Sequence, residues 1–380
     1  MNRRNSQMML ICTYCEEPYT GEDPPTTCRC GHPLEAQLDL RESVPATATV
    51  NLDDPSLWRY RTILPPIDDR HIMTLVEGWT DLRSGGDYGG ATVYFKDETV
   101  NPTGSFKDRG MSLAVSHLKR SGVTEACLPS AGNAGVSVAA YCEEAGIECH
   151  VYLPEMIPSP FVKATEKYSA HVHLGGQTIA EAAARMNGEK EKRWFDLSTL
   201  KEPFRVEGKK TLGYEIAEHL DWHFPDVVVY PAGGGTGLVG MWKAFNEMKR
   251  LGWVEGALPR MVAVQSAGCA PVVKAFAAGA LETVPWQDGD TAALGLNVAN
   301  PLGGAWMLKV LRQSDGIAVM VNEEDVAVAR KEVAISSGTE SSPEAGVAWR
   351  GFQKLSGSGW IREGETVVIP ITGSADRYEV

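Results

Sequence analysis

The chain has 380 residues, 43% hydrophobic and 22% charged, which is enough for two domains and typical of an ordinary soluble globular protein. Its 36 basic and 49 acidic residues give a net charge of -13, which argues against a nucleic-acid or anionic-membrane partner. The first ten residues lack the apolar stretch of a signal peptide, so we expect a cytoplasmic protein. Its cysteines then indicate metal binding or buried thiols rather than disulfides.

Four cysteines lie near the start of the chain: Cys12, Cys15, Cys28 and Cys30. The spacing of the first two is typical of a zinc knuckle, whereas the second two are closer together, and His32 could replace one thiolate. The pattern predicts a zinc-ribbon-like segment with a structural zinc ion, because so short a segment cannot build its own core. The alternative is a ribbon that has lost its metal.

The next elements lead into a loop. Residues 55–60 favour a short helix, and residues 73–80 are predicted to form a strand followed by a turn. Residues 91–96 are rich in β-branched and aromatic side chains, which indicates a strand. Apolar residues recur at helical spacing over 111–119.

The loop between that strand and that helix, residues 101–110, is Asn-Pro-Thr-Gly-Ser-Phe-Lys-Asp-Arg-Gly. Its proline and glycine predict a sharp turn that places Lys107 at the start of the helix. The N–H groups and dipole of a helix start attract anions and favour the neutral form of a nearby amine. Lys107 is therefore a Schiff-base candidate, the alternative being an exposed, solvated loop lysine.

Strands and helices alternate through the rest of the chain. Strands are predicted at 126–129, 148–153, 170–174, 226–230, 261–265 and 367–371. Helices are predicted at 133–145, 160–168, 178–186 and 239–249. Such alternation with short connections predicts parallel sheets covered by helices on both faces.

Two turns in this series lie where ligands bind in parallel sheets. The turn at 130–135, Ser-Ala-Gly-Asn-Ala-Gly, is by itself best interpreted as an ordinary turn in which Asn133 caps the helix. The glycine-rich turn at 231–238 can bring backbone N–H groups to a phosphate. It also matches the dinucleotide fingerprint G-x-G-x-x-G, but the next strand ends at 265–267 without a carboxylate, which favours a monophosphate.

The segment 101–110 resembles the pyridoxal-phosphate (PLP) lysine segment of threonine synthases, which belong to the tryptophan-synthase-β-like group (fold-type II) of PLP enzymes. The runs at 75–80 and 200–211 and the glycine-rich turn extend the resemblance over nearly the whole chain. The resemblance implies an α/β fold of two open parallel-sheet domains with PLP between them. The expected division is a zinc-ribbon-like segment 1–44, a large PLP domain of 45–110 and 193–380, and a small α/β domain 111–192.

The same resemblance implies roles for individual residues. Lys107 would bind the cofactor and act as the catalytic base, Asn133 would contact the ring 3-hydroxyl, and Thr372 would face the pyridine nitrogen. The cofactor phosphate would be held by Gly233, Gly234, Gly235, Thr236 and Gly237. The substrate would contact Ser105, Ser130, Ala131, Gly132, Ala134 and Arg205.

The implied reaction is conversion of O-phospho-L-homoserine and water to L-threonine and phosphate in a homodimer. Threonine synthases commonly have hydroxyl side chains beside the asparagine, where this chain has Ala131 and Ala134, and an Asn-Pro where it has Glu202-Pro203. The alternative therefore keeps PLP but catalyses β-elimination or β-replacement, as in serine or threonine ammonia-lyases or cysteate synthases. A third interpretation is a nucleotide-binding regulatory protein that uses the glycine-rich turn.

Overall fold

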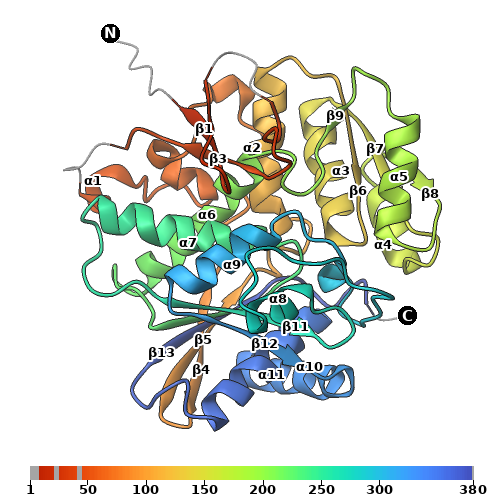
Figure 1. Ribbon diagram of the computed structural model, residues 1–380. Coiled ribbons are helices and arrows are strands. Elements are labelled where there is room, and N and C mark those ends of the chain that lie inside the picture. The colour runs from red at the N-terminus through yellow and green to blue at the C-terminus, as the bar shows by residue number, and fades with distance from the viewer. Residues whose placement is uncertain (1–7, 21–24, 41–44, 379–380) are drawn as a thin grey trace.

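The computed structural model describes residues 8–20, 25–40 and 45–378 (Figure 1). The strands are β1 Met9–Cys12, β2 Pro18–Tyr19, β3 Leu34–Gln37, β4 Leu82–Tyr88, β5 Ala91–Asp97, β6 Glu125–Pro129, β7 Glu148–Leu153, β8 His171–Leu174, β9 Phe195–Asp196, β10 Val227–Pro231, β11 Arg260–Ser266, β12 Ile317–Val321 and β13 Thr366–Ile371.

The α-helices are α1 Ala46–Thr49, α2 Lys107–Arg120, α3 Asn133–Ala145, α4 Ser159–Glu166, α5 Ile179–Glu189, α6 Phe204–His219, α7 Thr236–Arg250, α8 Pro271–Ala277, α9 Gly304–Gln313, α10 Glu323–Ser337 and α11 Pro343–Gly357. The 3-10 helices are η1 Leu57–Ile63, η2 Asp69–His71 and η3 Leu294–Leu296. The described helices all lack the combination of length and apolar character that a membrane span requires.

These elements form three sheets. The larger sheet has the order β12-β11-β10-β13-β5-β4, the smaller sheet has the order β8-β7-β6-β9, and β2-β1-β3 form an antiparallel sheet near the N-terminus. All neighbours in the first two sheets are parallel except β4, which pairs antiparallel with β5 at the edge. The predicted α/β fold with two parallel sheets is confirmed.

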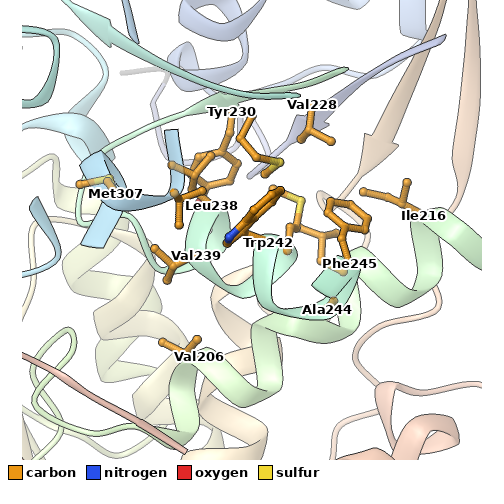
Figure 2. Close-up of a cluster of buried hydrophobic side chains, with 14 of the residues drawn as sticks. Val206, Ile216, Val228, Tyr230, Leu238, Val239, Trp242, Ala244, Phe245 and Met307 are labelled. Atoms are coloured by element: carbon orange, nitrogen blue, oxygen red, sulfur yellow. The ribbon is translucent and has the colours of Figure 1, made fainter. Parts of the chain in front are cut away.

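Helices cover both faces of the larger sheet. On one face, α6 and α7 pack against each other and against the strands, and Figure 2 shows Trp242 and Phe245 of α7 within this apolar cluster. Helices α10 and α11 cover the opposite face, where Trp349 and Phe352 are buried. The strands read as continuous apolar runs because they are buried on both sides.

The order of the larger sheet brings distant segments of the chain together. Strands β10, β13 and β5 are neighbours and parallel, so their carboxyl ends lie at the same edge. The glycine-rich turn follows β10, Thr372 follows β13, and the lysine loop follows β5. The smaller sheet contributes the turn at 130–135, which follows β6.

One predicted element is wrong. Residues 73–80 form no strand, because Val76, Gly78 and Trp79 have positive φ angles of 67°, 92° and 47°. Such angles are incompatible with an extended strand. Side chains rather than a neighbouring strand bind this backbone: Glu77 accepts the N–H of Leu75, 2.9 Å away.

Candidate active site

Lys107 is the first residue of α2, and its loop is attached to the end of β13. The Phe106 N–H donates to the Thr372 carbonyl at 3.1 Å, and Ser105 forms a bridge with Gly373. The Ser105 hydroxyl accepts from the Lys107 N–H at 3.3 Å. The structure therefore places Lys107 and Ser105 directly beside Thr372, as the sequence alone could not show.

Lys107 is half-buried, and its Nζ lies 3.9 Å from the centroid of the Phe106 ring. Burial of the amine and the nearby Arg205 guanidinium lower its pKa, the Glu344 carboxylate raises it, and the net result is a pKa of about 7. About half of the amine is therefore neutral and nucleophilic at pH 7, which favours the Schiff-base interpretation over that of a solvated loop lysine.

Buried carboxylates hold the lysine loop in shape. Asp108 accepts from the Thr103 N–H at 2.7 Å and from the Ser137 hydroxyl at 2.6 Å. Arg109 lies between two carboxylates, with Nε 2.6 Å from Glu98 and NH1 2.5 Å from Glu215. These groups are almost fully buried and satisfy one another, which keeps the backbone on either side of Lys107 fixed.

The run at 75–80 is bound to the same network. Glu215 accepts from the Trp79 N–H at 2.7 Å, the Asn101 side-chain carbonyl accepts from the Gly78 N–H at 3.0 Å, and the Thr80 hydroxyl donates to Glu98 at 2.6 Å. The run at 75–80 and the lysine segment, which both carry the family resemblance, are therefore parts of one hydrogen-bonded unit.

The glycine-rich turn leads into α7 through Gly235, whose φ of +84° is the left-handed conformation that glycine favours. A Cβ at Gly235 would lie 2.5 Å from the Met307 sulfur, and one at Gly233 would lie 2.3 Å from the Gly295 carbonyl oxygen. Side chains are thus excluded from the turn, and backbone N–H groups at the start of a helix are suited to bind an anion.

The lysine loop and the glycine-rich turn are close to each other. The ring of Phe106 packs edge-on against that of Tyr230, in β10, with 6.2 Å between centroids. Lys209 of α6 lies between the two loops, because its Nζ donates to the Thr236 hydroxyl at 2.9 Å and lies 4.9 Å from the Phe106 ring centroid.

Asn133 faces the end of the chain rather than its own helix. The N-cap of α3 is Gly132 and no side chain caps the helix, so the interpretation of Asn133 as a simple cap is wrong. The Asn133 side-chain oxygen instead accepts from Arg377 at 3.1 Å, and its nitrogen lies 3.5 Å from the Tyr378 hydroxyl. The Asn133 nitrogen also lies 3.0 Å from where a Cβ of Gly373 would be, next to Thr372.

Other predicted substrate residues surround this turn. The Ser130 hydroxyl accepts from the Gly135 N–H at 2.9 Å and donates to the Gly132 carbonyl at 3.0 Å, so it holds the turn. Ala131 and Ala134 are half-buried beside it. Arg205 is 1% exposed at the start of α6, and its Nε has no hydrogen-bond partner among the described residues.

Three further residues complete the surroundings and were not predicted. Lys209 was part of the charged run at 200–211, where nothing in the sequence distinguished it from its neighbour Lys210. Glu344, at the start of α11, accepts from the Gly295 N–H at 2.7 Å and from the Tyr378 hydroxyl at 3.1 Å. No sequence signal pointed to Glu344 or Tyr378, because these contacts depend on how the strands are ordered.

The four N-terminal cysteines converge. Their sulfur atoms all lie within 4.8 Å of one another, with 3.5 Å between Cys12 and Cys30 and 3.5 Å between Cys15 and Cys28. The His32 Nδ1 lies 3.5 Å from the Cys30 sulfur. Four convergent thiols at these separations match a tetrahedral zinc site.

The ribbon formed by β1–β3 contacts α7, the helix that follows the glycine-rich turn. Lys243 of α7 donates to the Ala36 carbonyl and lies 3.4 Å from Glu35.

The residues around Lys107 fit pyridoxal phosphate. A neutral amine can bind the aldehyde, glycine N–H groups and a helix start can bind the phosphate, and Thr372 and Asn133 supply polar side chains nearby. The carboxyl edge of a parallel sheet is where such folds bind their ligands.

The model of the family described as "Pyridoxal-phosphate dependent enzyme" matches residues 73–373. The threonine synthase of Methanocaldococcus jannaschii is 32% identical over 374 residues, which cover 96% of this chain and 92% of that protein. The threonine synthase of Methanosarcina acetivorans is 33% identical over 96% of this chain and 91% of its own length.

Solved structures share the fold. The processed form of threonine deaminase isoform 2 from Solanum lycopersicum superposes with a TM-score of 0.67 at 22% identity, covering 88% of this chain and 95% of that chain. Maize serine racemase superposes with a TM-score of 0.66 at 21% identity, covering 78% of this chain and 88% of that chain. With a family model spanning most of the sequence and a lysine site that fits the cofactor, the chain belongs to the pyridoxal-phosphate-dependent enzymes and is similar over nearly its whole length to threonine synthases.

Proposed function

We propose that this enzyme is a PLP-dependent lyase of the threonine synthase type, which converts O-phospho-L-homoserine and water to L-threonine and phosphate. The observation that carries this proposal is the 32–33% identity to threonine synthases over 96% of the chain. The half-neutral amine of Lys107 at the carboxyl edge of the larger sheet supports it, because the reaction begins with removal of a proton from a carbon atom.

Each residue of the site has a proposed task. When bound, PLP supplies an electron sink for negative charge at the substrate α-carbon. Lys107 takes the proton from that carbon as general base, since a pKa of about 7 leaves much of its amine neutral near neutral pH. Thr372 would hold the pyridine nitrogen and Asn133 the 3-hydroxyl of the cofactor, while the N–H groups of 233–237 would hold its phosphate.

Substrate binding is proposed for the turn at 130–134 and for Ser105 and Arg205. The backbone N–H groups of Ala131 and Ala134 suit the substrate carboxylate, while that of Gly132 donates to the Ser130 hydroxyl at 3.2 Å and so helps to hold the turn in place. Arg205 is suited to the leaving phosphate, since its buried Nε has no hydrogen-bond partner among the described residues.

A second candidate function uses the same cofactor for β-elimination or β-replacement. It is favoured by Ala131 and Ala134, which offer no side-chain hydroxyl to the substrate. Both candidates require the same lysine and the same phosphate cradle, so they differ in the leaving group and in the carbon atom, γ or β, from which it departs.

The purified protein separates the candidates in two steps. We expect a visible absorbance band that borohydride bleaches and that Lys107→Ala abolishes. If the band is absent from the original protein as well as from Lys107→Ala, the assignment to the PLP enzymes is contradicted and a nucleotide-binding protein is favoured. Phosphate release from O-phospho-L-homoserine is then compared with ammonia release from L-serine and L-threonine. Release of ammonia without release of phosphate would establish the second candidate.

Further features of the molecule remain proposals. We propose a structural zinc ion on Cys12, Cys15, Cys28 and Cys30, supported by the convergence of their sulfur atoms. We also propose a cytoplasmic homodimer, which size-exclusion chromatography with light scattering would test. The division into a zinc-ribbon-like segment, a large PLP domain and a small α/β domain is supported by the three separate sheets.

A further inference from the structure

Lys209 is a fully buried cation placed at the glycine-rich turn. It lies on α6 with 0% exposure, and its only described hydrogen bond is to the hydroxyl of Thr236, at 2.9 Å. Thr236 is the first residue of α7 and directly follows the three glycines of the turn. The amine of Lys209 therefore lies at the helix start that would receive a phosphate.

Other lysines buried in this protein have carboxylate partners. Lys96 lies 2.8 Å from Glu215, Lys210 lies 2.9 Å from Glu207, and Lys243 also contacts Glu207. In the part of the chain that the structure describes, Lys209 forms no ion pair with any carboxylate. A buried charge without a counter-charge is strongly disfavoured, so this position calls for an anion.

The charged groups around Lys209 are mostly cations. Burial lowers its pKa well below the ordinary value, the positive charges of Arg205 and Lys107 lower it too, and the Glu202 carboxylate opposes them without forming an ion pair in the part of the chain that the structure describes. An anion placed among these groups would satisfy the charge on Lys209 and also that on Arg205.

Lys209 lies close to the lysine that takes the cofactor aldehyde. The amines of Lys107 and Lys209 lie 3.9 Å and 4.9 Å from the centroid of the same ring, that of Phe106. The aldehyde and the phosphate arm of PLP are carried by adjacent ring carbons. A group that binds the phosphate must therefore lie near the one that binds the aldehyde, as Lys209 does.

We propose that Lys209 is a ligand of the cofactor phosphate, to which its ammonium group donates a charge-assisted hydrogen bond beside the N–H groups of the glycine-rich turn. The phosphate supplies the counter-charge that the protein itself does not provide. This inference rests on the assignment of PLP to Lys107 and the turn at 233–237.

The test compares Lys209→Met with Lys210→Met, two changes at adjacent buried positions on one helix. The apo forms are prepared by removing the cofactor, and the affinities for PLP and for pyridoxal, which lacks the phosphate, are measured by absorbance titration. For Lys209→Met we expect the Kd for PLP to rise roughly 10- to 100-fold, the effect of losing one charge-assisted hydrogen bond. The Kd for pyridoxal should be unchanged.

Thermal unfolding of the same apo proteins provides the second readout. Lys209→Met removes a buried amine that has no carboxylate partner among the described residues, so it should unfold at the same temperature as the original protein or higher. Lys210→Met removes one of the two cations that contact Glu207 and Glu247, leaving only Lys243, so it should unfold at a clearly lower temperature while its affinity for PLP changes little.

The outcomes separate this inference from the proposed function. If Lys209→Met binds PLP as tightly as the original protein, or loses PLP and pyridoxal affinity equally, Lys209 is not a phosphate ligand. A raised KM for O-phospho-L-homoserine with an unchanged Kd for PLP would assign Lys209 to the substrate and overturn the inference too. If the original protein binds no PLP at all, both the proposed function and the inference on Lys209 fail. Borohydride reduction followed by peptide mapping should place the PLP label on Lys107 in both the original protein and Lys209→Met. That result would support the assignment of PLP to Lys107, on which the inference rests.

Discussion

Lys107 shows how surroundings turn a common side chain into a reactive one. The pKa of Lys107 is lowered by its burial and by the charge of Arg205, and Glu344 acts in the opposite direction. These causes depend on the packed structure and not on the decamer itself. Asp108 and Arg109, the next two residues, have no part in this and instead anchor the loop. Adjacent residues in one motif thus have different physical tasks.

The pH dependence of cofactor capture tests the assignment of Lys107. Because burial disfavours the ammonium form, the amine loses its proton at a pKa of about 7 rather than at the ordinary 10.5. The rate at which the apo protein captures PLP should rise with pH through about 7 and then level off, as followed by stopped-flow absorbance. A rate that keeps rising toward the pKa of an exposed lysine would show that Lys107 is solvated, and Lys107→Ala should show no capture.

The glycine-rich turn and α7 act as one element. Gly235 has a left-handed φ and no room for a side chain, so the turn can bend sharply only with glycine there. Its position at the carboxyl end of β10 brings the start of α7 to the edge where the lysine loop and Thr372 also lie. The proposed phosphate cradle thus lies at the junction of a strand and a helix, where backbone N–H groups are joined by the side chain of Lys209.

Gly235→Ala should harm this junction more than a matched glycine change elsewhere. Gly279 has a similar φ of +66° but open space around it, so Gly279→Ala costs only backbone strain, about 1–2 kcal/mol. Gly235→Ala adds a clash with Met307, for which overpacking typically costs about 1–3 kcal/mol more. Denaturant unfolding of the apo proteins measures both costs, and equal losses for the two variants would contradict the role of Met307.

The cysteine ribbon packs on α7 through Lys243, so its metal should stabilise the protein without taking part in the reaction. We expect one zinc ion per chain by mass spectrometry of metals, its loss in Cys28→Ser, and a lower unfolding temperature with the PLP absorbance band retained. His32→Ala should keep the metal, because the four thiols complete a tetrahedron without it. A metal-free original protein purified with zinc present would refute the site.

Buried charges connect segments that are far apart in the chain. Glu215 of α6 lies 2.5 Å from Arg109 of α2, 2.8 Å from Lys96 of β5 and 2.7 Å from the Trp79 N–H. One carboxylate therefore holds the run at 75–80, the strand before the lysine loop and the helix after it. Burial raises the pKa of Glu215, whereas Arg109 and Lys96 lower it. The effect of the two cations is larger, so the pKa lies below its ordinary value and Glu215 stays ionised.

Glu215→Gln should destabilise the protein by about 3–5 kcal/mol, because it leaves Arg109 and Lys96 short of a buried counter-charge. Glu144, an exposed glutamate on α3, serves as the control, and Glu144→Gln should change stability by less than about 0.5 kcal/mol. Urea unfolding of both variants gives the comparison. Similar small losses would mean that the network does not hold the lysine loop.

The amino-acid sequence alone was sufficient for the fold class, most helices and strands and the family, and it singled out Lys107, whose role stays a prediction. These features are encoded locally: apolar periodicity marks the buried face of an element, and turn residues mark where it ends. The strand predicted at 73–80 was wrong because the side-chain pattern there is typical of a strand. Glu77 and Glu215 instead bind this backbone in a conformation that no local pattern reveals.

Only the tertiary structure decided which residues face one another at the site. Lys209 meets Thr236, Asn133 meets Arg377, and Glu344 meets Tyr378 because β10, β13 and β5 are neighbours in the sheet and not in the chain. The pKa of Lys107 also depends on the tertiary structure, since its burial and its proximity to Arg205 arise only once α2 and α6 have packed. Contacts across a hundred residues depend on strand order, which periodicity does not record.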